Sequence, residues 1–223
     1  MAVLNADLNQ FASVDASKLA WQASPAAGVW RKRLYLDGPA ETGRVTSLVL
    51  YDAGASFPAH DHPDGEEVLV LAGVFSDETG DWGPGSYLAS PEGYRHAPHS
   101  ASGCELLVRL RQYRGAGREL VRSDTNAIAW QPSARSGIDQ KTLFDHDRLN
   151  ERARLIRFAP GAEVPSHPHP FGEEIYVLEG GFADDNGFYG AGCWVRNPPG
   201  SAHAARSKAG AILFIRNGGM GRP

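Results

Sequence analysis

The sequence predicts an all-β fold built from two similar domains in tandem, and two observations lead to this prediction. Short runs rich in β-branched and aromatic residues alternate with turn residues along the whole chain, which has 26 Gly and 15 Pro in 223 residues. In addition, a long segment occurs twice, and each copy is too long to be a solenoid unit. We therefore expect two antiparallel barrels, each with its own core.

The repeat is clearest around a histidine-rich motif. The segment HDHPDGEEVLVLAG at 60–73 recurs as HPHPFGEEIYVLEG at 167–180, an offset of 107 residues. Further upstream the offset is 109, as between Trp21 and Trp130, so the first copy has two extra residues in an early loop. The predicted domains are residues 1–115 and 116–223. The offset of 107 also relates Gly85 to Gly192, Pro91 to Pro198, Gly93 to Gly200 and His96 to His203.

The strands of each copy can be placed from composition and flanking turn residues. We expect strands at 45–51, 68–71, 86–89 and 105–111 in the first copy, and at 153–158, 175–178, 193–196 and 211–216 in the second. Helical periodicity is weak along the chain, and the first twenty residues are the best candidate for a helix.

Composition excludes several classes of function. The net charge of −4 and a pI near 6.1 argue against binding to nucleic acid or to an anionic membrane surface. No apolar run is long enough to cross a bilayer and the N-terminus does not resemble a secretory signal, so we expect a cytoplasmic protein with no membrane partner. The two cysteines, Cys104 and Cys193, are expected to be small buried hydrophobic residues.

A metal site is predicted from the spacing of four residues in each copy. His60 and His62 are two apart, so both side chains point to one face of a strand. Glu66 follows a Pro-Asp-Gly bend, and His96 comes from a separate hairpin. Three imidazoles and one carboxylate suit Zn(II), Fe(II), Mn(II) or Ni(II) and leave room for a water or substrate. The second copy supplies His167, His169, Glu173 and His203 at the same spacings.

The distribution of histidines favours ligands over isolated polar residues, because six of the eight fall on the same three repeat positions. His99 is outside this set, since its repeat partner is Arg206, and a role for His99 beside the site or at its rim stays open. His146 is expected in a surface loop. Glu67 and Glu174 directly follow the predicted ligand glutamates, so they should point to the opposite face, outward or behind the ligands.

These spacings resemble the two motifs of the cupin superfamily, whose domains are double-stranded β-helix (jelly-roll) barrels. The first copy reads Gly54-x5-His60-x-His62-x3-Glu66-x6-Gly73, followed by Gly85-x5-Pro91-x-Gly93-x2-His96, and the second copy fits equally well. One motif position, usually Asn and not a ligand, is Ser100 in the first copy and Ser207 in the second. The resemblance implies two tandem cupin barrels.

The first copy also resembles the cupin domain of the anti-sigma factor ChrR, in the segments HPDGEEVLVLAGVFSDETGDW and HAPHSASGCELLVRLRQ. That resemblance implies zinc, with the ligands at His60, His62, Glu66 and His96. ChrR-type proteins grip their sigma factor through an N-terminal zinc domain that needs a His-x3-Cys-x2-Cys cluster. Here the first histidine is His60 and the first cysteine is Cys104, so that domain is absent from this sequence.

Three functions follow from these observations. The similarity to ChrR favours a regulatory or sensory protein with a divalent metal in each barrel, zinc first, and a protein partner such as a sigma factor. The alternative is a metal-dependent dioxygenase acting on a small diketone or hydroxyaryl ketone, for which no catalytic residue beyond the metal set is predicted. A third possibility is a metal that mainly stabilises the barrel. A small-molecule ligand and a homo-oligomer are compatible with each of these.

Overall fold

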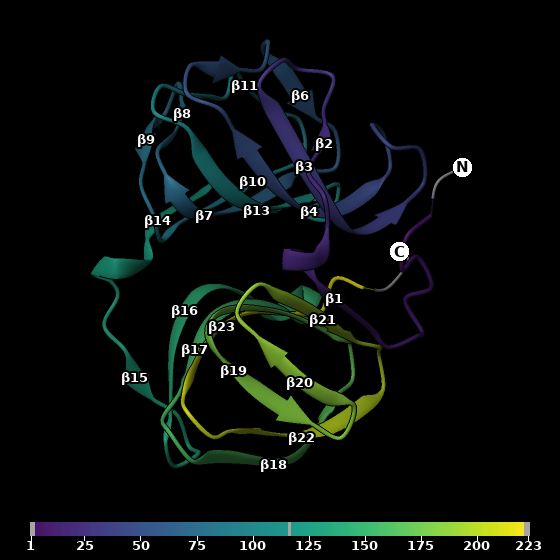
Figure 1. The fold of residues 1–223 in the computed structure, drawn as a ribbon, viewed down its shortest axis with the longest axis vertical. Helices are drawn as coiled ribbons and strands as arrows, with labels where there is room; N and C mark the ends of the chain where they lie inside the picture. Colours follow the sequence, from purple (N-terminus) through teal and green to yellow (C-terminus); the bar gives the residue numbers. More distant parts are fainter. Residues whose placement is uncertain (1–2, 116, 221–223) are drawn as a thin grey trace. The chain divides into compact units, whose positions relative to one another are not determined.

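The computed structural model describes residues 3–115 and 117–220, and they form almost entirely β-structure (Figure 1). The described chain contains short 3-10 turns but no α-helix. The helix expected in the first twenty residues is wrong: strand β1 (Ala12–Asp15) and the turn η1 (Ala16–Lys18) lie there. Pairing of β1 with another strand satisfies its backbone groups, and the Asp15 carboxylate accepts a hydrogen bond from the amide of Ser17 (3.0 Å), which starts the turn.

The first compact unit contains one large antiparallel sheet and two smaller groups of strands. The large sheet has the order β14 (Val121–Asp124), β10 (Ser86–Ser90), β7 (Glu66–Gly73), β13 (Cys104–Leu110), β4 (Arg44–Tyr51), β3 (Val29–Asp37) and β2 (Gln22–Ala23). The smaller groups are β5 (Ala55–Ser56), β12 (His99–Ser100), β8 (Phe75–Asp77) and β9 (Gly80–Trp82), and the pair β6 (His60–His62) and β11 (Tyr94–His96).

The second unit repeats this plan, with its strands curving around a common interior (Figure 1). The main path has the order β1, β21 (Cys193–Asn197), β19 (Glu173–Asp184), β23 (Ala211–Asn217), β17 (Glu151–Phe158), β16 (Ile138–His146) and β15 (Gln131–Pro132). The other wall contains β18 (Ala162–His169), β22 (Ser201–Ser207) and β20 (Gly187–Gly190). Each strand expected from the sequence lies within an observed strand or overlaps it, and the all-β prediction is confirmed.

The two repeats exchange their first strands. Strand β1 starts the first repeat but pairs with β21, and β14 starts the second repeat but pairs with β10. The compact units are therefore residues 3–6 with Leu19–Ala127, and Asp7–Lys18 with 128–220. The predicted boundaries at 1–115 and 116–223 follow the sequence repeat and do not coincide with these units, because sequence similarity does not indicate which sheet a terminal strand joins.

Each unit has a core of its own. Alternate side chains of the strands point inward and bury mainly Val, Ile, Leu and Phe, among them Val68 and Leu106 in the first unit and Val177 and Leu213 in the second. Burial of each such side chain contributes about 1.5–3 kcal/mol to stability. The cores hold the strands in fixed register, and the register positions the polar residues described below.

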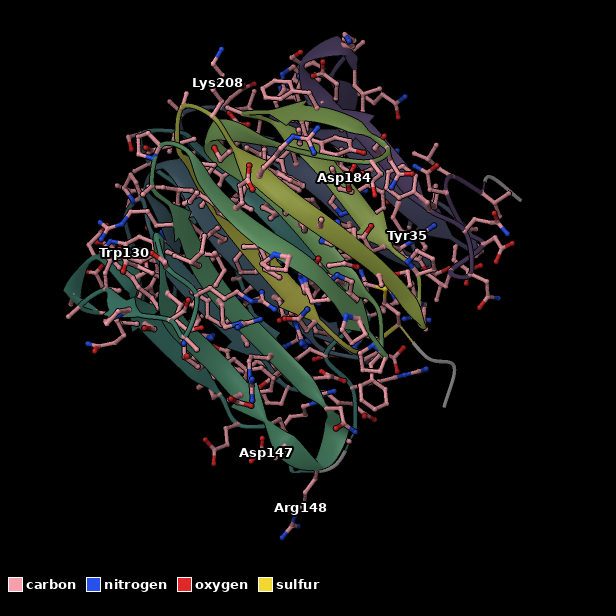
Figure 2. All side chains as sticks on the ribbon, turned by 90° about the horizontal axis from the view of Figure 1, so that it is seen from below. Tyr35, Trp130, Asp147, Arg148, Asp184 and Lys208 are labelled. Atoms are coloured by element: carbon pink, nitrogen blue, oxygen red, sulfur yellow. The ribbon has the colours of Figure 1, made fainter. Side chains whose placement is uncertain are left out.

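The change of offset from 109 to 107 lies in one loop. Between β3 and β4 the loop spans 38–43, whereas the equivalent connection between β16 and β17 spans 147–150, which is two residues shorter. Figure 2 shows Asp147 and Arg148 at the tip of the shorter loop. The prediction of two extra residues in an early loop of the first copy is thus confirmed.

The upstream repeat has a structural counterpart as well. The ammonium group of Lys32 lies 4.6 Å from the ring centroid of Trp21, and the equivalent pair, Lys141 and Trp130, has the same distance. Both pairs are cation–π contacts, which bring the short strands β2 and β15 against their neighbours. No helix among the described residues is long and apolar enough to span a membrane.

Candidate metal centre

Strand register brings together the three predicted histidines of the first unit. In the antiparallel pair β6–β11, His60 is directly opposite His96 and His62 is opposite Tyr94. Because His60 and His62 share a face of β6, their imidazole rings converge with that of His96, at centroid distances of 4.8–5.3 Å.

A glycine places the glutamate beside them. Gly65 has φ +71°, and a Cβ at this position would lie 2.4 Å from the carbonyl oxygen of Tyr113. The Gly65 amide donates to the carbonyl of His62 (3.2 Å), which closes the turn and makes Glu66 the first residue of β7. Only glycine fits this left-handed, crowded position, so the Pro-Asp-Gly bend predicted from the sequence is required to bring Glu66 to the histidines.

The four side chains of the first set are close enough to share one ion. The Nε2 atoms of His62 and His96 are 2.8 Å apart, and each lies 3.6 Å from Oε2 of Glu66. One nitrogen from each of the three histidines lies within 4.8 Å of the others. His62, Glu66 and His96 are buried, whereas His60 is half-buried.

The second set has the same arrangement on longer strands. His167 and His203 are opposite each other in the pair β18–β22, and their three-histidine cluster also includes His169. The Glu173 carboxylate oxygens lie 3.6 Å from Nδ1 of His169 and 3.7 Å from Nε2 of His203. Glu173 also accepts hydrogen bonds from the side-chain amides of Asn197 (3.3 Å) and Asn217 (3.0 Å). The structure thus brings together all eight predicted ligand residues as two sets of four.

The donor atoms fit a divalent metal. His60 and His167 donate Nδ1–H to the carbonyls of Pro58 (2.9 Å) and Pro165 (3.0 Å), which leaves the Nε2 lone pair of each ring available. Nε2 of His169 is fully buried and has no hydrogen-bond partner among the described residues, so the polar groups of this ring are not all satisfied by the protein. Three neutral nitrogens and one carboxylate oxygen suit Zn, Fe, Mn or Ni.

Two residues that the sequence reasoning missed orient one ligand in each set. Asp77 Oδ2 lies 3.3 Å from Nδ1 of His96, and Asp184 Oδ2 lies 3.0 Å from Nδ1 of His203. Asp184, labelled in Figure 2, ends the long strand β19, and Asp77 ends β8. A carboxylate on Nδ1 directs the Nε2 lone pair at the metal and increases its basicity. The sequence contains a signal for these two aspartates, because positions 77 and 184 are also 107 residues apart.

The surroundings set the pKa values of these groups. Burial lowers the pKa of His62 and His167 and brings that of His169 to about 4, with further lowering at His169 from the nearby charges of His203, Arg135 and Arg154. For His96, burial lowers the pKa, but the hydrogen bond to Asp77 and the charge of Glu66 outweigh it and raise the pKa overall. The pKa of Asp77 is lowered, since hydrogen bonds from His96 and Thr79 outweigh the effect of burial.

The remaining histidines and Arg206 lie outside both sets. His99 is exposed, with Nδ1 3.4 Å from the carbonyl of Ala97, and Arg206 is exposed on β22. His146 ends strand β16 rather than lying in a loop, because β16 continues its pairing with β17 as far as Glu151.

Four further residues near the motifs are buried. Glu67 and Glu174 point away from the ligand glutamates, as expected, but are buried rather than on the outer surface; Glu67 accepts a hydrogen bond from the Tyr87 hydroxyl (2.7 Å) and pairs with Arg109. Ser100 and Ser207, which replace the usual Asn, donate to backbone carbonyls of Val74 (2.5 Å) and Gly181 (2.6 Å) and tie neighbouring turns together.

Each set opens onto a cavity inside its barrel. The first cavity, about 360 Å³, is lined by His60, His62, Glu66 and apolar side chains that include Phe57 and Leu106. The second, about 530 Å³, is lined by all four residues of its set and by apolar side chains that include Phe158, Val164 and Phe182. Metal sets that face a cavity can contact a small molecule, which a fully enclosed structural site cannot do.

Solved structures with the same fold span nearly the whole chain. A putative dioxygenase from Nostoc punctiforme PCC 73102 has a TM-score of 0.78 at 16% identity, covering 96% of this chain and 85% of its own. Protein Ylba from E. coli has a TM-score of 0.73 at 17% identity, with 98% and 95% covered. An oxalate decarboxylase from Lactobacillus farciminis has a TM-score of 0.67 at 15% identity, with 92% and 86% covered. At these identities the likeness shows the fold alone.

Family membership comes from the sequence itself. No curated protein matches the chain. The family model described as ChrR Cupin-like domain, in contrast, matches twice, over residues 9–114 and 118–221, which together make up most of the chain. The resemblance expected for the first copy is confirmed and extends to the second copy, where it was not expected, and the chain belongs to the ChrR cupin-like family as a protein with two cupin barrels.

Proposed function

We propose that the protein is a metal-dependent enzyme of the dioxygenase type, acting on a small diketone or hydroxyaryl ketone within its barrels. The observation that carries the proposal is the opening of each three-His, one-Glu set onto a cavity of substrate size, about 360 and 530 Å³. A bound Fe(II) or similar ion would supply Lewis-acid and oxygen-activating chemistry.

The residues of the chain would prepare each site for this chemistry. Pro58 and Asp77 bind Nδ1 of His60 and His96, which leaves Nε2 of each ring for an ion, and Pro165 and Asp184 do the same for His167 and His203. The apolar walls exclude water and accept the carbon skeleton of the substrate, which strengthens polar interactions at the metal. The cavity that each set faces favours a catalytic role over a purely structural metal.

Oxygen uptake tests the proposal. Protein loaded anaerobically with Fe(II) should consume oxygen when a 1,3-diketone such as 1-phenyl-1,3-butanedione, or a hydroxyacetophenone, is added. Metal-free and zinc-loaded protein serve as controls and should consume none above background. The proposal fails if the Fe(II)-loaded protein, shown to contain iron, takes up no oxygen with any diketone or hydroxyaryl ketone.

A regulatory role is the second candidate, and membership of the ChrR cupin-like family favours it. In this role zinc or a small oxidised ligand would alter a surface that binds a protein such as a sigma factor. The test is co-purification with a sigma factor from zinc-loaded, metal-free and peroxide-treated protein. An association that responds neither to metal nor to oxidant, or no association at all, would rule this candidate out.

A further inference from the structure

One arginine distinguishes the second cavity. Arg154 lies on β17, on the same strand face as Ile156 and Phe158, and all three line the 530 Å³ cavity beside the metal set. The other lining side chains of β17 and its neighbours β16 and β23 are half apolar and half polar, and they include a second arginine, Arg152, which pairs with Asp145. Placing a guanidinium in this wall costs free energy, because burial of a charge is unfavourable unless it is compensated.

Neutral groups hold this guanidinium in place. Nη1 donates to Oε1 of Gln140 (3.2 Å), and Nη2 donates to Oδ1 of Asn217 (2.7 Å). Asn217 in turn donates to Oε1 of Glu173 (3.0 Å), so one amide side chain links Arg154 to the predicted metal ligand. The arginine is therefore held at a set place relative to Glu173.

The guanidinium of Arg154 has no carboxylate in direct contact within the described residues, although the charges of Glu173 and Asp145 act on it from nearby. It forms no ion pair there, and its Nε is fully buried without a hydrogen-bond partner. The acids around it have other partners: Asp145 pairs with Arg152 (2.6 Å), Glu151 with Arg216 (2.6 Å), and Glu173 with two amides. Burial lowers the pKa of Arg154, and the negative charges of Glu173 and Asp145 offset this only in part.

The first barrel differs at this point. Its residue equivalent to Arg154, 107 positions earlier, is the buried Ser47, which does not line the cavity. Two arginines line the first cavity: Arg31 pairs with Glu41 (2.7 Å) from the longer loop at 38–43, and Arg111 donates to the backbone carbonyls of Glu41 (3.2 Å) and Gly43 (3.3 Å). The first cavity therefore has no counterpart of Arg154 on the equivalent strand, and one of its two lining arginines is paired with a carboxylate.

We propose that the second barrel binds a small organic carboxylate, with the carboxylate on Arg154 and an apolar body against the cavity wall. This inference goes beyond the proposed function by assigning the second barrel a ligand that carries a carboxylate, and it rests on that cavity being a substrate site. A carboxylate accepts two N–H bonds from a guanidinium and supplies the missing negative charge. The wall around Phe158, Val164 and Phe182 suits an aryl or alkyl group.

Benzoate and its neutral isostere benzamide test the proposal by calorimetry on protein loaded with zinc in both barrels. We expect one benzoate site per chain and binding at least about tenfold tighter than that of benzamide, as for a hydrogen-bonded charge pair. The variant R154S, which installs the first barrel's residue, and R154Q should each weaken benzoate binding about 10- to 100-fold. R154K should recover part of the loss.

Controls separate this effect from loss of fold or metal. R206Q removes the same charge from an exposed position of the same barrel and should bind benzoate as the wild type does. Each variant should keep two zinc ions and its circular dichroism spectrum. The inference is overturned if wild-type protein binds no benzoate at millimolar concentration, if benzamide binds as tightly, or if metal-replete R154Q binds benzoate unchanged.

These outcomes are independent of the oxygenase test. Benzoate binding that depends on Arg154, without oxygen uptake on any ketone, would support the carboxylate site and reject the proposed activity. Oxygen uptake on neutral diketones, with no effect of R154Q on benzoate binding, would support the proposed activity and reject the carboxylate site.

Discussion

The two barrels share a metal set but differ in what surrounds it. In both, opposed strands bring three histidines together, a left-handed glycine turns the chain toward a glutamate, and an aspartate orients one imidazole. The first barrel then has a smaller cavity, which Ser47 does not line, and the second has a larger cavity with the half-buried Arg154 at the equivalent position in its wall. The comparison teaches that motif residues build the metal site, whereas residues outside the motifs decide what can approach it.

The predicted ligand glutamates of the two barrels also differ in their hydrogen-bond partners. Glu173 is held by the amides of Asn197 and Asn217, whereas the positions equivalent to these two asparagines in the first barrel are Ser90 and Leu110. A carboxylate with two fixed donors loses less freedom when it binds a metal. We therefore expect the second barrel to hold its metal more tightly than the first.

The largest effect should come from removing one ligand per barrel. His60→Ala and His167→Ala change half-buried histidines, so each variant should fold and lose about one of two metal equivalents. Elemental analysis of the wild type, both single variants and the double variant measures this, and also identifies the metal. Iron would favour the oxygenase, and zinc the regulatory role. Retention of two equivalents in either single variant would contradict the assignment of that set.

The aspartates should have the next largest effect, and an equal one in both barrels. Asp77→Asn and Asp184→Asn remove the carboxylate from Nδ1 of His96 and His203 but keep a similar shape. Metal affinity in the altered barrel should fall about 10- to 100-fold, as for other partners of ligand histidines. Competition with a chelator measures the affinity, and Asp81→Asn, in the hairpin after Asp77, serves as a control. Unchanged affinity in both variants would show that these aspartates only stabilise the hairpins.

Acid should release the metal of the two barrels at different pH values. The pKa of His169 is about 4 and that of His167 is lowered, so protons compete weakly for the second set; the raised pKa of His96 makes the first set easier to protonate. Native mass spectrometry of His60→Ala and His167→Ala across a pH series should show metal lost from the first barrel at a higher pH. Loss at the same pH, or from the second barrel first, would contradict this.

Acid should also destabilise the metal-free protein. In the unfolded chain His169 regains a pKa near 6.5, so below that pH the unfolded state binds more protons than the folded state. The free energy of unfolding contributed by neutral His169 therefore decreases as the pH falls from 6.5 toward 4. His96 acts in the opposite sense, because its raised pKa stabilises the folded state below 6.5 and this contribution is lost as the pH rises. Thermal unfolding of chelator-treated protein at several pH values measures the balance.

The smallest expected effect concerns the support of Glu173. Asn197→Ser introduces the first barrel's residue and removes one amide that holds the carboxylate. The bond is long, at 3.3 Å, and a typical hydrogen bond contributes about 0.5–1.5 kcal/mol, so metal affinity of the second barrel should fall only about two- to tenfold. Chelator competition with the reciprocal variant Ser90→Asn completes the comparison, and an increase in affinity for Asn197→Ser would show that the amide strains the site.

The sequence by itself determined the repeat, the all-β class and the eight residues that converge as two sets. This was possible because strand periodicity and a Gly turn are local rules, and the offset of 107 ties the two copies together. It could also have identified Asp77 and Asp184 from that offset, but no local rule says that a carboxylate will reach Nδ1 of a histidine 19 residues away.

Only the tertiary structure decided the exchange of β1 and β14, the burial of Glu67 and Glu174, and the presence of Arg154 in one cavity wall. Each depends on contacts between segments far apart in the chain, and no spacing in the sequence indicates which of these segments meet. Two barrels with the same ligands can therefore present different surroundings to a bound molecule, because pairing of distant strands sets the cavity around a locally encoded metal site.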